Sequence, residues 1–262
     1  MSANKQLGDF LLSRRRRLDP DVLRLPSIRR RRNAGLRREE VAQLAGISVE
    51  WYVKLEQGRV VAPSDETIAG LADALRLDDT ERRHLIALAK GGAVQSFVRE
   101  TVPDTLRAVV EGLSQPAYVT GRRFDVLVWN APAADLLSDF GVMADDDRNI
   151  LIWMLLDQTA RELFGGTWED EAKRMVSLFR TNSDIVGEDP QFKRIVERLI
   201  SGCPEFSEWW PRHDIEAPRS GTKHLRHPRH GDLTLKYSSF QANDDPFLKL
   251  AIYVEQQTSQ AK

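Results

Sequence analysis

The chain has little cysteine and no long apolar segment. Cys203 is its single cysteine, so no intramolecular disulfide can form and no cysteine pair is present to begin a zinc site. Its longest purely apolar run, Ile150 to Leu156, is far shorter than the ~20 residues of a membrane helix. The N-terminal segment also lacks the apolar core of a signal peptide. We therefore expect a cytoplasmic protein with no membrane partner.

Local motifs of catalysis, metal binding and nucleotide binding are missing as well. His213 and Asp214 are adjacent, but no G-x-S-x-G nucleophile elbow accompanies them, and no P-loop or Rossmann fingerprint occurs. His224, His227 and His230 recur every three residues. Positions three apart on a strand point to opposite faces, which disfavours a shared metal ion. We expect no enzymatic activity, no metal and no cofactor.

What the chain does have is an uneven distribution of charge. The 262 residues, 41% of them hydrophobic, suit about two domains, and the net charge is only −1. Residues 1–63 nevertheless hold 14 Lys and Arg against 7 Asp and Glu, whereas the remainder holds 24 against 32. Two runs of four arginines, Arg14–Arg17 and Arg29–Arg32, belong to the basic part. Such a block is either a solvated face or a contact for a polyanion.

The stretch LRREEVAQLAGISVEWYVKLEQGR, residues 36–59, predicts two short helices joined by a tight turn. Apolar residues recur at helical spacing from Leu36 to Gly46, and glycine accepts the left-handed conformation that ends a helix. Ser48 is a good N-cap for a second helix that ends at Gly58. Small side chains at Ala42 and Gly46 are interpreted as allowing the helices to cross closely. The stretch is thus a helix-turn-helix, whose second helix would enter a DNA major groove ~12 Å wide.

The remainder of the chain predicts a second domain. Glycines 91 and 92 and Pro103 indicate a linker over residues 91–103, between domains at 1–90 and 104–257. A helix is expected at Asp104–Leu113, followed by a hairpin in PAYVTGRRFDVLVWN. Helical segments come next, and GTKHLRHPRHGDLTLKYSSF and FLKLAIYVE are extended. Strands at both ends with helices between them indicate an α+β domain with an antiparallel sheet.

Both halves resemble one known family. GLRREEVA, LAG, Ser48, Tyr52 and LEQGR are similar to the XRE/Cro-type helix-turn-helix. YVTGRRFDVLVWN, RNILIWMLLD, EFSEWWPRHDI and SGTKHLRHPRHGDLTLKY are similar to the ligand-binding domain of MmyB-like transcription regulators. The resemblance implies a multidomain fold: an all-α five-helix domain, with further helices near residues 6–17, 65–76 and 80–90, followed by a PAS-like α+β domain. It also marks residues 18–33 as an arginine-rich insertion that could contact phosphates.

By position, the resemblance implies a double-stranded DNA operator as partner. Glu50 can accept a hydrogen bond from a cytosine amino group and Lys54 can donate one to guanine, while arginines contact phosphates. Trp51 and Tyr52 are expected to pack, and Glu56 to pair with one of Arg14–Arg17. The predicted DNA-binding residues are Arg30, Arg31, Arg37, Arg38, Ser48, Val49, Glu50, Lys54 and Arg59.

The family resemblance further implies a buried pocket for a small apolar ligand, with a fatty acid as the usual suggestion. An arginine fork suits a carboxylate, and aromatic and aliphatic side chains suit a tail. The same residues could equally pack the core of the domain. The predicted ligand-binding residues are Tyr118, Trp129, Asn130, Trp153, Leu156, Phe164, Arg212, His213 and Asp214.

These predictions combine into a sequence-specific transcription regulator that senses a small ligand. One recognition helix reads few base pairs, so a homodimer on two half-sites is expected. Two alternatives stay open. The second domain could be only a dimerisation or protein-interaction module with a filled core, or it could be a small-molecule enzyme tethered to DNA.

Overall fold

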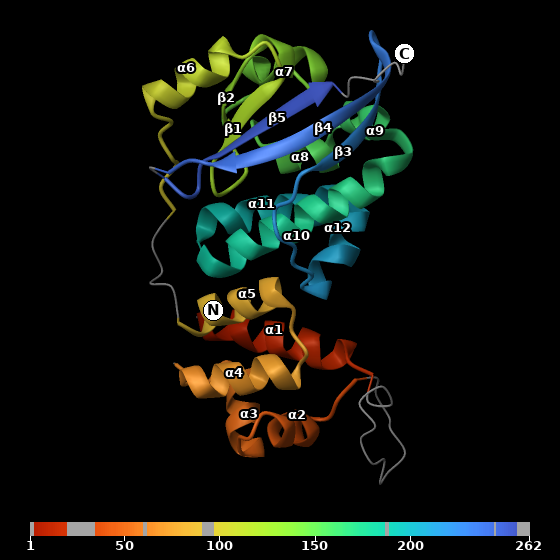
Figure 1. The fold of residues 1–262 in the computed structure, drawn as a ribbon. Helices are drawn as coiled ribbons and strands as arrows, with labels where there is room; N and C mark the ends of the chain where they lie inside the picture. The colour runs from red at the N-terminus through yellow and green to blue at the C-terminus, as the bar shows by residue number, and fades with distance from the viewer. Residues whose placement is uncertain are drawn as a thin grey trace, which may run out of the picture. The chain divides into compact units, whose positions relative to one another are not determined.

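The computed structural model describes residues 3–19, 35–59, 62–90, 97–186, 189–243 and 245–255. The chain separates into two compact units, each drawn in Figure 1. The first unit comprises residues 1–97, 180–193 and 210–216, and the second comprises residues 98–179, 194–209 and 217–262. The units are therefore not two uninterrupted stretches of sequence. No helix in the described part of the chain is long and apolar enough to cross a membrane.

Five helices form the N-terminal part of the first unit, as predicted. They are α1 (Ala3–Arg17), α2 (Arg38–Leu44), α3 (Val49–Glu56), α4 (Asp65–Ala74) and α5 (Asp79–Ala89). Side-chain caps fix several of their starts: Ser48, Ser64 and Asp78 each accept a hydrogen bond from the first turn of α3, α4 and α5. One apolar cluster joins all five helices, with Phe10, Val41, Tyr52, Leu71 and Leu85 among its buried members.

Glycines allow close helix crossings in this unit at positions other than the predicted one. A Cβ atom added to Gly8 of α1 would lie 2.4 Å from the carbonyl oxygen of Glu56, and one added to Gly70 of α4 would lie 2.5 Å from that of Ala45. A Cβ atom on Gly46 would meet nothing within 4 Å. The interpretation of Gly46 as a spacer between crossing helices was therefore wrong. Its φ of 68° is what requires glycine.

The second unit is built on one five-stranded antiparallel sheet, confirming the predicted α+β class. The strands are β1 (Ala117–Thr120), β2 (Val126–Trp129), β3 (Gly221–His227), β4 (Gly231–Gln241) and β5 (Lys249–Glu255), in the order β2-β1-β5-β4-β3. The predicted hairpins β1–β2 and β3–β4 are both present. The C-terminal strand β5 joins them by pairing with β1 on one side and β4 on the other. The fold is the PAS-like one expected.

One helix, α6, precedes the first hairpin, and the other helices lie between the two hairpins. The helices are α6 (Asp104–Gly112), α7 (Ala131–Leu136), α8 (Ile150–Leu156), α9 (Gln158–Phe164), α10 (Trp168–Val186), α11 (Pro190–Gly202) and α12 (Pro204–Trp209), with single 3₁₀ turns at Phe140–Val142, Gly165–Thr167 and Trp210–Arg212. Helix α6 packs on β1 and β2, where Val110, Ala117, Val119 and Val128 form a buried cluster on one face of the sheet (Figure 1). The opposite face carries the pocket described below.

Candidate DNA-binding helix and ligand pocket

The turn between α2 and α3 has a geometry that sets the direction of the second helix. Gly46 adopts a left-handed conformation, with the Ile47 N–H donating to the Ala42 carbonyl and the Gly46 N–H donating to that of Gln43. This pattern of bonds is the Schellman motif, which stops a helix sharply. Ser48 then accepts a hydrogen bond of 3.1 Å from the backbone N–H of Trp51 and starts α3. The predicted helix-turn-helix is thus present at the predicted residues.

One side of α3 is buried and the other is exposed. Tyr52 and Leu55 lie in the core of the unit, and Trp51 packs partly against it, as expected for packing aromatics. Glu50 and Lys54, one helical turn apart, form an ion pair of 2.8 Å with 79% and 48% of their side chains exposed. Ser48 and Val49 are exposed as well. The residues predicted to approach base edges therefore share one open face of α3.

A buried carboxylate attaches this helix to its neighbours. The side chain of Glu56 is 2% exposed and receives Arg15 Nε at 2.7 Å and Arg38 Nη2 at 2.7 Å. Burial alone would raise the pKa of Glu56, but the hydrogen bonds from Arg15 and Arg38 outweigh it and hold the pKa below its usual value. The predicted pairing of Glu56 with an arginine of the first helix is confirmed. Glu56 thereby connects α1, α2 and α3.

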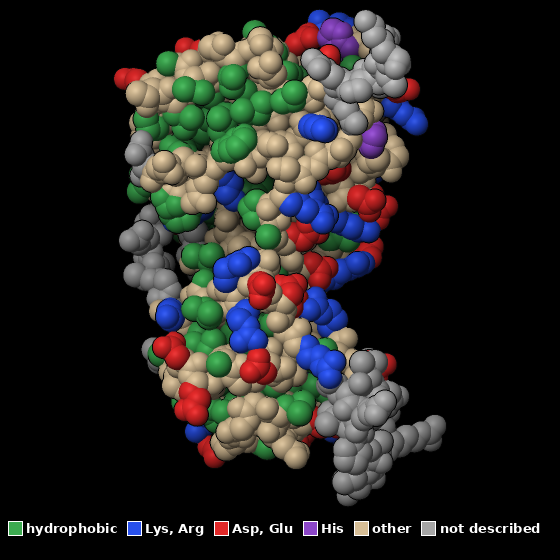
Figure 2. All heavy atoms as spheres, in the orientation of Figure 1, with side chains coloured by type: hydrophobic (Ala, Val, Ile, Leu, Met, Phe, Trp, Pro, Cys, Tyr) green, Lys and Arg blue, Asp and Glu red, His purple; other side chains and the backbone are tan. Residues whose placement is uncertain are grey.

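The arginines predicted to contact phosphate fall into two groups. Arg37 caps α2, Arg38 is its first residue, and Arg59 follows α3. The side chain of Arg38 is 44% exposed although it is bonded to Glu56. Arg30 and Arg31 lie outside the described residues. On the face shown in Figure 2, basic and acidic side chains of the described residues alternate and form no patch of one sign. The described basic residues therefore form no single patch on that face.

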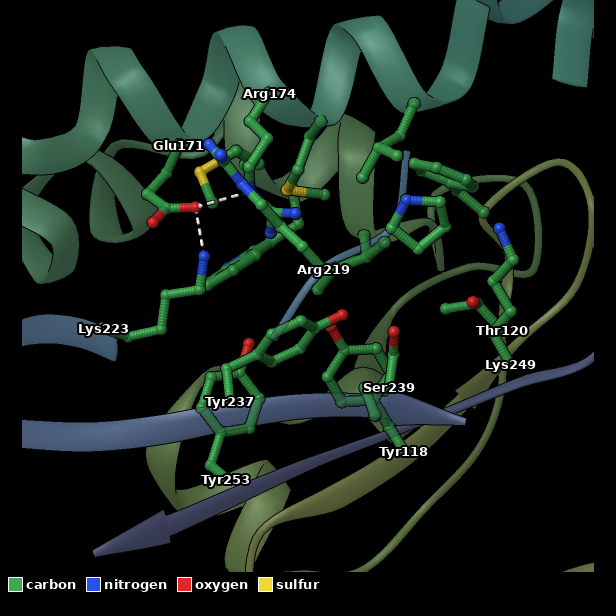
Figure 3. Close-up of a pocket in the computed structure, with 18 of the residues that line it drawn as sticks. Tyr118, Thr120, Glu171, Arg174, Arg219, Lys223, Tyr237, Ser239, Lys249 and Tyr253 are labelled. Carbon is green, nitrogen blue, oxygen red and sulfur yellow. Dashed lines mark hydrogen bonds and ion pairs between the residues drawn. The ribbon is translucent and has the colours of Figure 1, made fainter. Parts of the chain in front are cut away.

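A pocket of about 70 Å³ lies on the inner face of the sheet in the second unit (Figure 3). Its floor consists of alternate residues of neighbouring strands, as the two-residue period of a strand requires. The register places Ala251 of β5 beside Ser239 of β4 and Tyr118 of β1, and Lys249 beside Thr120. Ala251 and Ser239 are small, so the middle of the floor is left open. This open floor is the physical origin of the pocket.

The remaining walls come mainly from helices. Apolar side chains of α8, α9 and α10 cover the floor: Ile150, Trp153, Met154, Phe164, Met175 and Leu178. Asn149 caps α8 through its side-chain oxygen and donates to the Arg123 carbonyl in the β1–β2 turn, which holds α8 on the hairpin. Phe124 of the same turn lines the pocket with a φ of 69°. A buried aromatic residue with positive φ is rare and indicates a turn held in place by its surroundings.

The charged side chains of the pocket are mostly cationic. Arg174, Arg219, Lys223 and Lys249 line it together with a single carboxylate, Glu171. Glu171 accepts hydrogen bonds from Lys223 Nζ and from Arg174 Nε, the latter at 3.3 Å. Burial lowers the pKa of Lys223, and the nearby Arg174 lowers it further. The pocket therefore has an excess of positive charge in an apolar enclosure.

Three tyrosines line the floor on β1, β4 and β5. Tyr118 and Tyr237 each lie within van der Waals range of Tyr253, with ring centroids 6.4 Å and 5.3 Å away. Burial raises the pKa of all three phenols, because removal from water disfavours the phenolate. They are neutral at physiological pH and available as hydrogen-bonding hydroxyls.

Three of the nine predicted ligand-binding residues line this pocket: Tyr118, Trp153 and Phe164. Trp129 packs edge-on against Phe140 at 5.9 Å, and Leu156 lies against Gly202 at the end of α11. Asn130 accepts hydrogen bonds from the N–H groups of Ala117 and Ala133 and donates to the carbonyls of Val110, Leu113 and Gln115. Its amide is fully engaged within the protein, so its observed role is structural.

Arg212, His213 and Asp214 belong to the first unit and are not among the residues that line the pocket. Arg212 and His213 border a separate hollow together with residues of α1 such as Asp9 and Arg16. Burial lowers the pKa of His213 to about 4, with a further contribution from the charge of Arg180, so its ring is neutral at pH 7. The predicted arginine fork thus lies outside the pocket.

None of the charged residues of the pocket was among the predicted site residues: they are Glu171, Arg174, Arg219, Lys223 and Lys249. The alternating pattern of β5 could have placed Lys249 on the same face as Tyr253, since the two are four residues apart. The histidine triplet is divided: His227 and His230 stack at 4.5 Å and contact Asp135, whereas His224 lies beside Thr234. No cluster that could hold a metal ion is found among the described residues.

Comparison with known proteins gives two family matches. A model described as the MmyB-like transcription regulator ligand binding domain matches residues 102–262, and one described as a helix-turn-helix domain matches residues 6–85. A search of curated proteins finds no match. A helix-turn-helix joined to a ligand-binding domain defines a DNA-binding transcription regulator. The chain belongs to the MmyB-like transcription regulators.

Proposed function

We propose that α3 reads the major groove of a DNA operator in a sequence-specific manner. The observation that carries this proposal is the two-sided character of α3. Its inner side is fixed to α1 and α2 through Glu56, while Glu50 and Lys54 are exposed on the other side. A rigidly held helix with exposed polar side chains suits base contacts, because the side chains that read bases need a fixed register. Ser48, Val49 and Arg59 extend this contact surface, and Arg37 and Arg38 contact phosphates.

We further propose that the second unit binds a small apolar ligand of the fatty-acid type. The apolar roof of the pocket, over a floor whose middle residues Ala251 and Ser239 are small, supports this proposal. The volume of about 70 Å³ is less than half of the ~150 Å³ cavity that accepts benzene in an engineered protein, so a long tail requires side chains to move. Met154 and Met175 are unbranched and adapt readily to such a change.

The regulator is proposed to act as a homodimer. A single helix contacts only a few base pairs, and two copies spaced by one helical turn of DNA supply the missing affinity and specificity. Ligand binding would change how the sensor domains pack and thereby the separation of the two recognition helices, which is a coupling between two sites. A ligand that leaves operator affinity unchanged would contradict this mechanism.

The test is binding to a duplex that spans the DNA flanking the protein's own gene, compared with a scrambled duplex. Replacing both residues of the exposed pair, Glu50→Ala with Lys54→Ala, should reduce specific affinity roughly 10- to 100-fold, since a base contact contributes about 1–3 kcal/mol. The matched control removes another exposed i, i+4 pair, Glu169 and Lys173 of α10, whose side chains are 61% and 40% exposed. Equal binding of the wild type to both duplexes would overturn sequence-specific reading.

A further inference from the structure

Lys249 lies at one end of the pocket, far along the sheet from the ion-paired lysine. It is the first residue of β5 and pairs with Thr120 of β1. Lys223 of β3 instead pairs with Leu235 of β4, which in turn pairs with Glu255 at the other end of β5. Lys249 and Glu255 are six residues apart, which corresponds to roughly 20 Å along a strand. Figure 3 shows the same separation, with Lys249 and Thr120 at the opposite end from Lys223 and Glu171. The pocket therefore has two polar ends.

The two ends differ in how their positive charge is compensated. At one end, Glu171 bonds to both Lys223 and Arg174. At the other end, no hydrogen bond or ion pair reaches the ammonium of Lys249 from any residue that the structure describes. Burial lowers the pKa of Lys249. Lys249 is half-buried, and the partial removal of an ammonium from water without a partner has a cost that an anion beside it offsets.

A second polar group in the pocket also has no partner. Trp153 is 3% exposed, and its indole Nε1–H finds no acceptor among the described residues. Indole N–H and ammonium are both donors only, so neither can satisfy the other. These two donors favour a ligand that supplies acceptors, and the ammonium favours acceptors with negative charge.

We propose that Lys249 binds the carboxylate of the ligand, with the apolar tail lying under α8 and α10. The inference rests on the ligand-binding function proposed above and adds the orientation and the head-group charge. A carboxylate matches Lys249, a cation of the pocket without a partner among the described residues, whereas a fatty alcohol leaves its charge uncompensated and an amine adds a like charge. At the other end, Lys223 and Arg174 already bond to the carboxylate of Glu171, so that end is not proposed as the anchor.

The experiment measures calorimetric binding of decanoate, decanol and decylamine to the full-length protein, each kept below its aggregation threshold. Wild type should bind decanoate most tightly and decylamine least. Lys249→Gln should weaken decanoate binding about 10- to 100-fold, the usual effect of losing a charge-assisted hydrogen bond, and should leave decanol binding unchanged. Lys249→Arg keeps the charge and should retain most of the affinity for decanoate.

Lys236→Gln is the matched control. Lys236 is an exposed lysine of β4. It is adjacent to Tyr237, whose side chain lies on the pocket face, so Lys236 lies on the opposite face of the sheet. The substitution should alter none of the three affinities. The proposed role of Lys249 would be overturned if wild type bound decanoate and decanol with equal affinity, or if Lys249→Gln bound decanoate as tightly as wild type. Either result would still be consistent with an apolar ligand in the pocket. Failure of wild type to bind any of the three compounds would overturn the proposed ligand-binding function itself.

Discussion

Arg15 of α1 and Glu56 of α3 form a nearly buried ion pair in which Nε and Oε2 are 2.7 Å apart. A second bond between the same groups, from Nη2 to Oε1 at 3.1 Å, makes the contact bidentate and fixes its direction. Glu56 is the last residue of the proposed recognition helix. The orientation of that helix is therefore determined by a polar contact as well as by the apolar core.

Replacing Glu56 with glutamine should reduce stability at pH 7 by roughly 3 kcal/mol, because Arg15 then keeps a buried charge with no counter-ion. The folded-state pKa of Glu56 lies below the unfolded value of ~4.3. The stabilisation by the carboxylate is thus complete above that value and is lost as the pH falls through the lower folded pKa. Urea unfolding at pH 7, 5 and 3 measures the difference between wild type and variant. A difference that stays constant down to pH 3 would contradict the assignment.

Alanine at two glycines should have unequal effects. Gly46→Ala places a side chain in open space and incurs only the left-handed backbone conformation, about 1–2 kcal/mol. Gly8→Ala puts Cβ 2.4 Å from a backbone oxygen of α3, so the helices must separate and the unit should lose much more stability. Thermal unfolding of both variants tests this order. A larger effect at Gly46 would restore the spacer interpretation that the structure contradicts.

Arg38→Ala should make DNA binding less sensitive to salt. Each phosphate contact that is removed lowers the slope of log affinity against log salt concentration by about one. Arg83→Ala, an exposed arginine of α5, is the charge-matched control and should leave the slope unchanged. Binding to the same duplex at several salt concentrations provides both slopes. Equal slopes for the two variants would show that Arg38 makes no phosphate contact and acts only as an ion-pair partner of Glu56.

Asn130→Ala should destabilise the second unit by roughly 2–4 kcal/mol. Two contributions add to this loss of stability. Helix α7 loses its N-cap, and the buried Val110 carbonyl and Ala117 N–H lose their hydrogen-bond partner. Because Asn130 is not among the residues lining the pocket, the fraction of protein that remains folded should bind decanoate as the wild type does. Chemical unfolding and calorimetry measure the two effects separately. If the Asn130→Ala variant had wild-type stability but did not bind decanoate, the structural role of Asn130 would be contradicted and a role in ligand binding would be supported.

The fold was largely predictable because its signals are local. Capping serines, a glycine with positive φ and alternating apolar residues in β4 each act within a few neighbours. The pocket was predicted less well, since its lining comes from strands and helices far apart in the sequence. Tyr118, Trp153 and Phe164 were found because large aromatics are expected to be buried. Alternation along β5 places Lys249 on the face of Tyr253, but Lys249 was missed because nothing in the sequence shows that this face lines a pocket.

The two small residues in the middle of the pocket floor have a consequence for how ligand preference can change. Ala251 and Ser239 are neighbours on β5 and β4, and both lie between the two polar ends of the sheet. A larger side chain at either position shortens the space for a tail without touching the group that binds its head or the hydrogen bonds between the strands. Tail length and head-group charge are therefore set by different residues, so evolution can adjust one while the other is preserved.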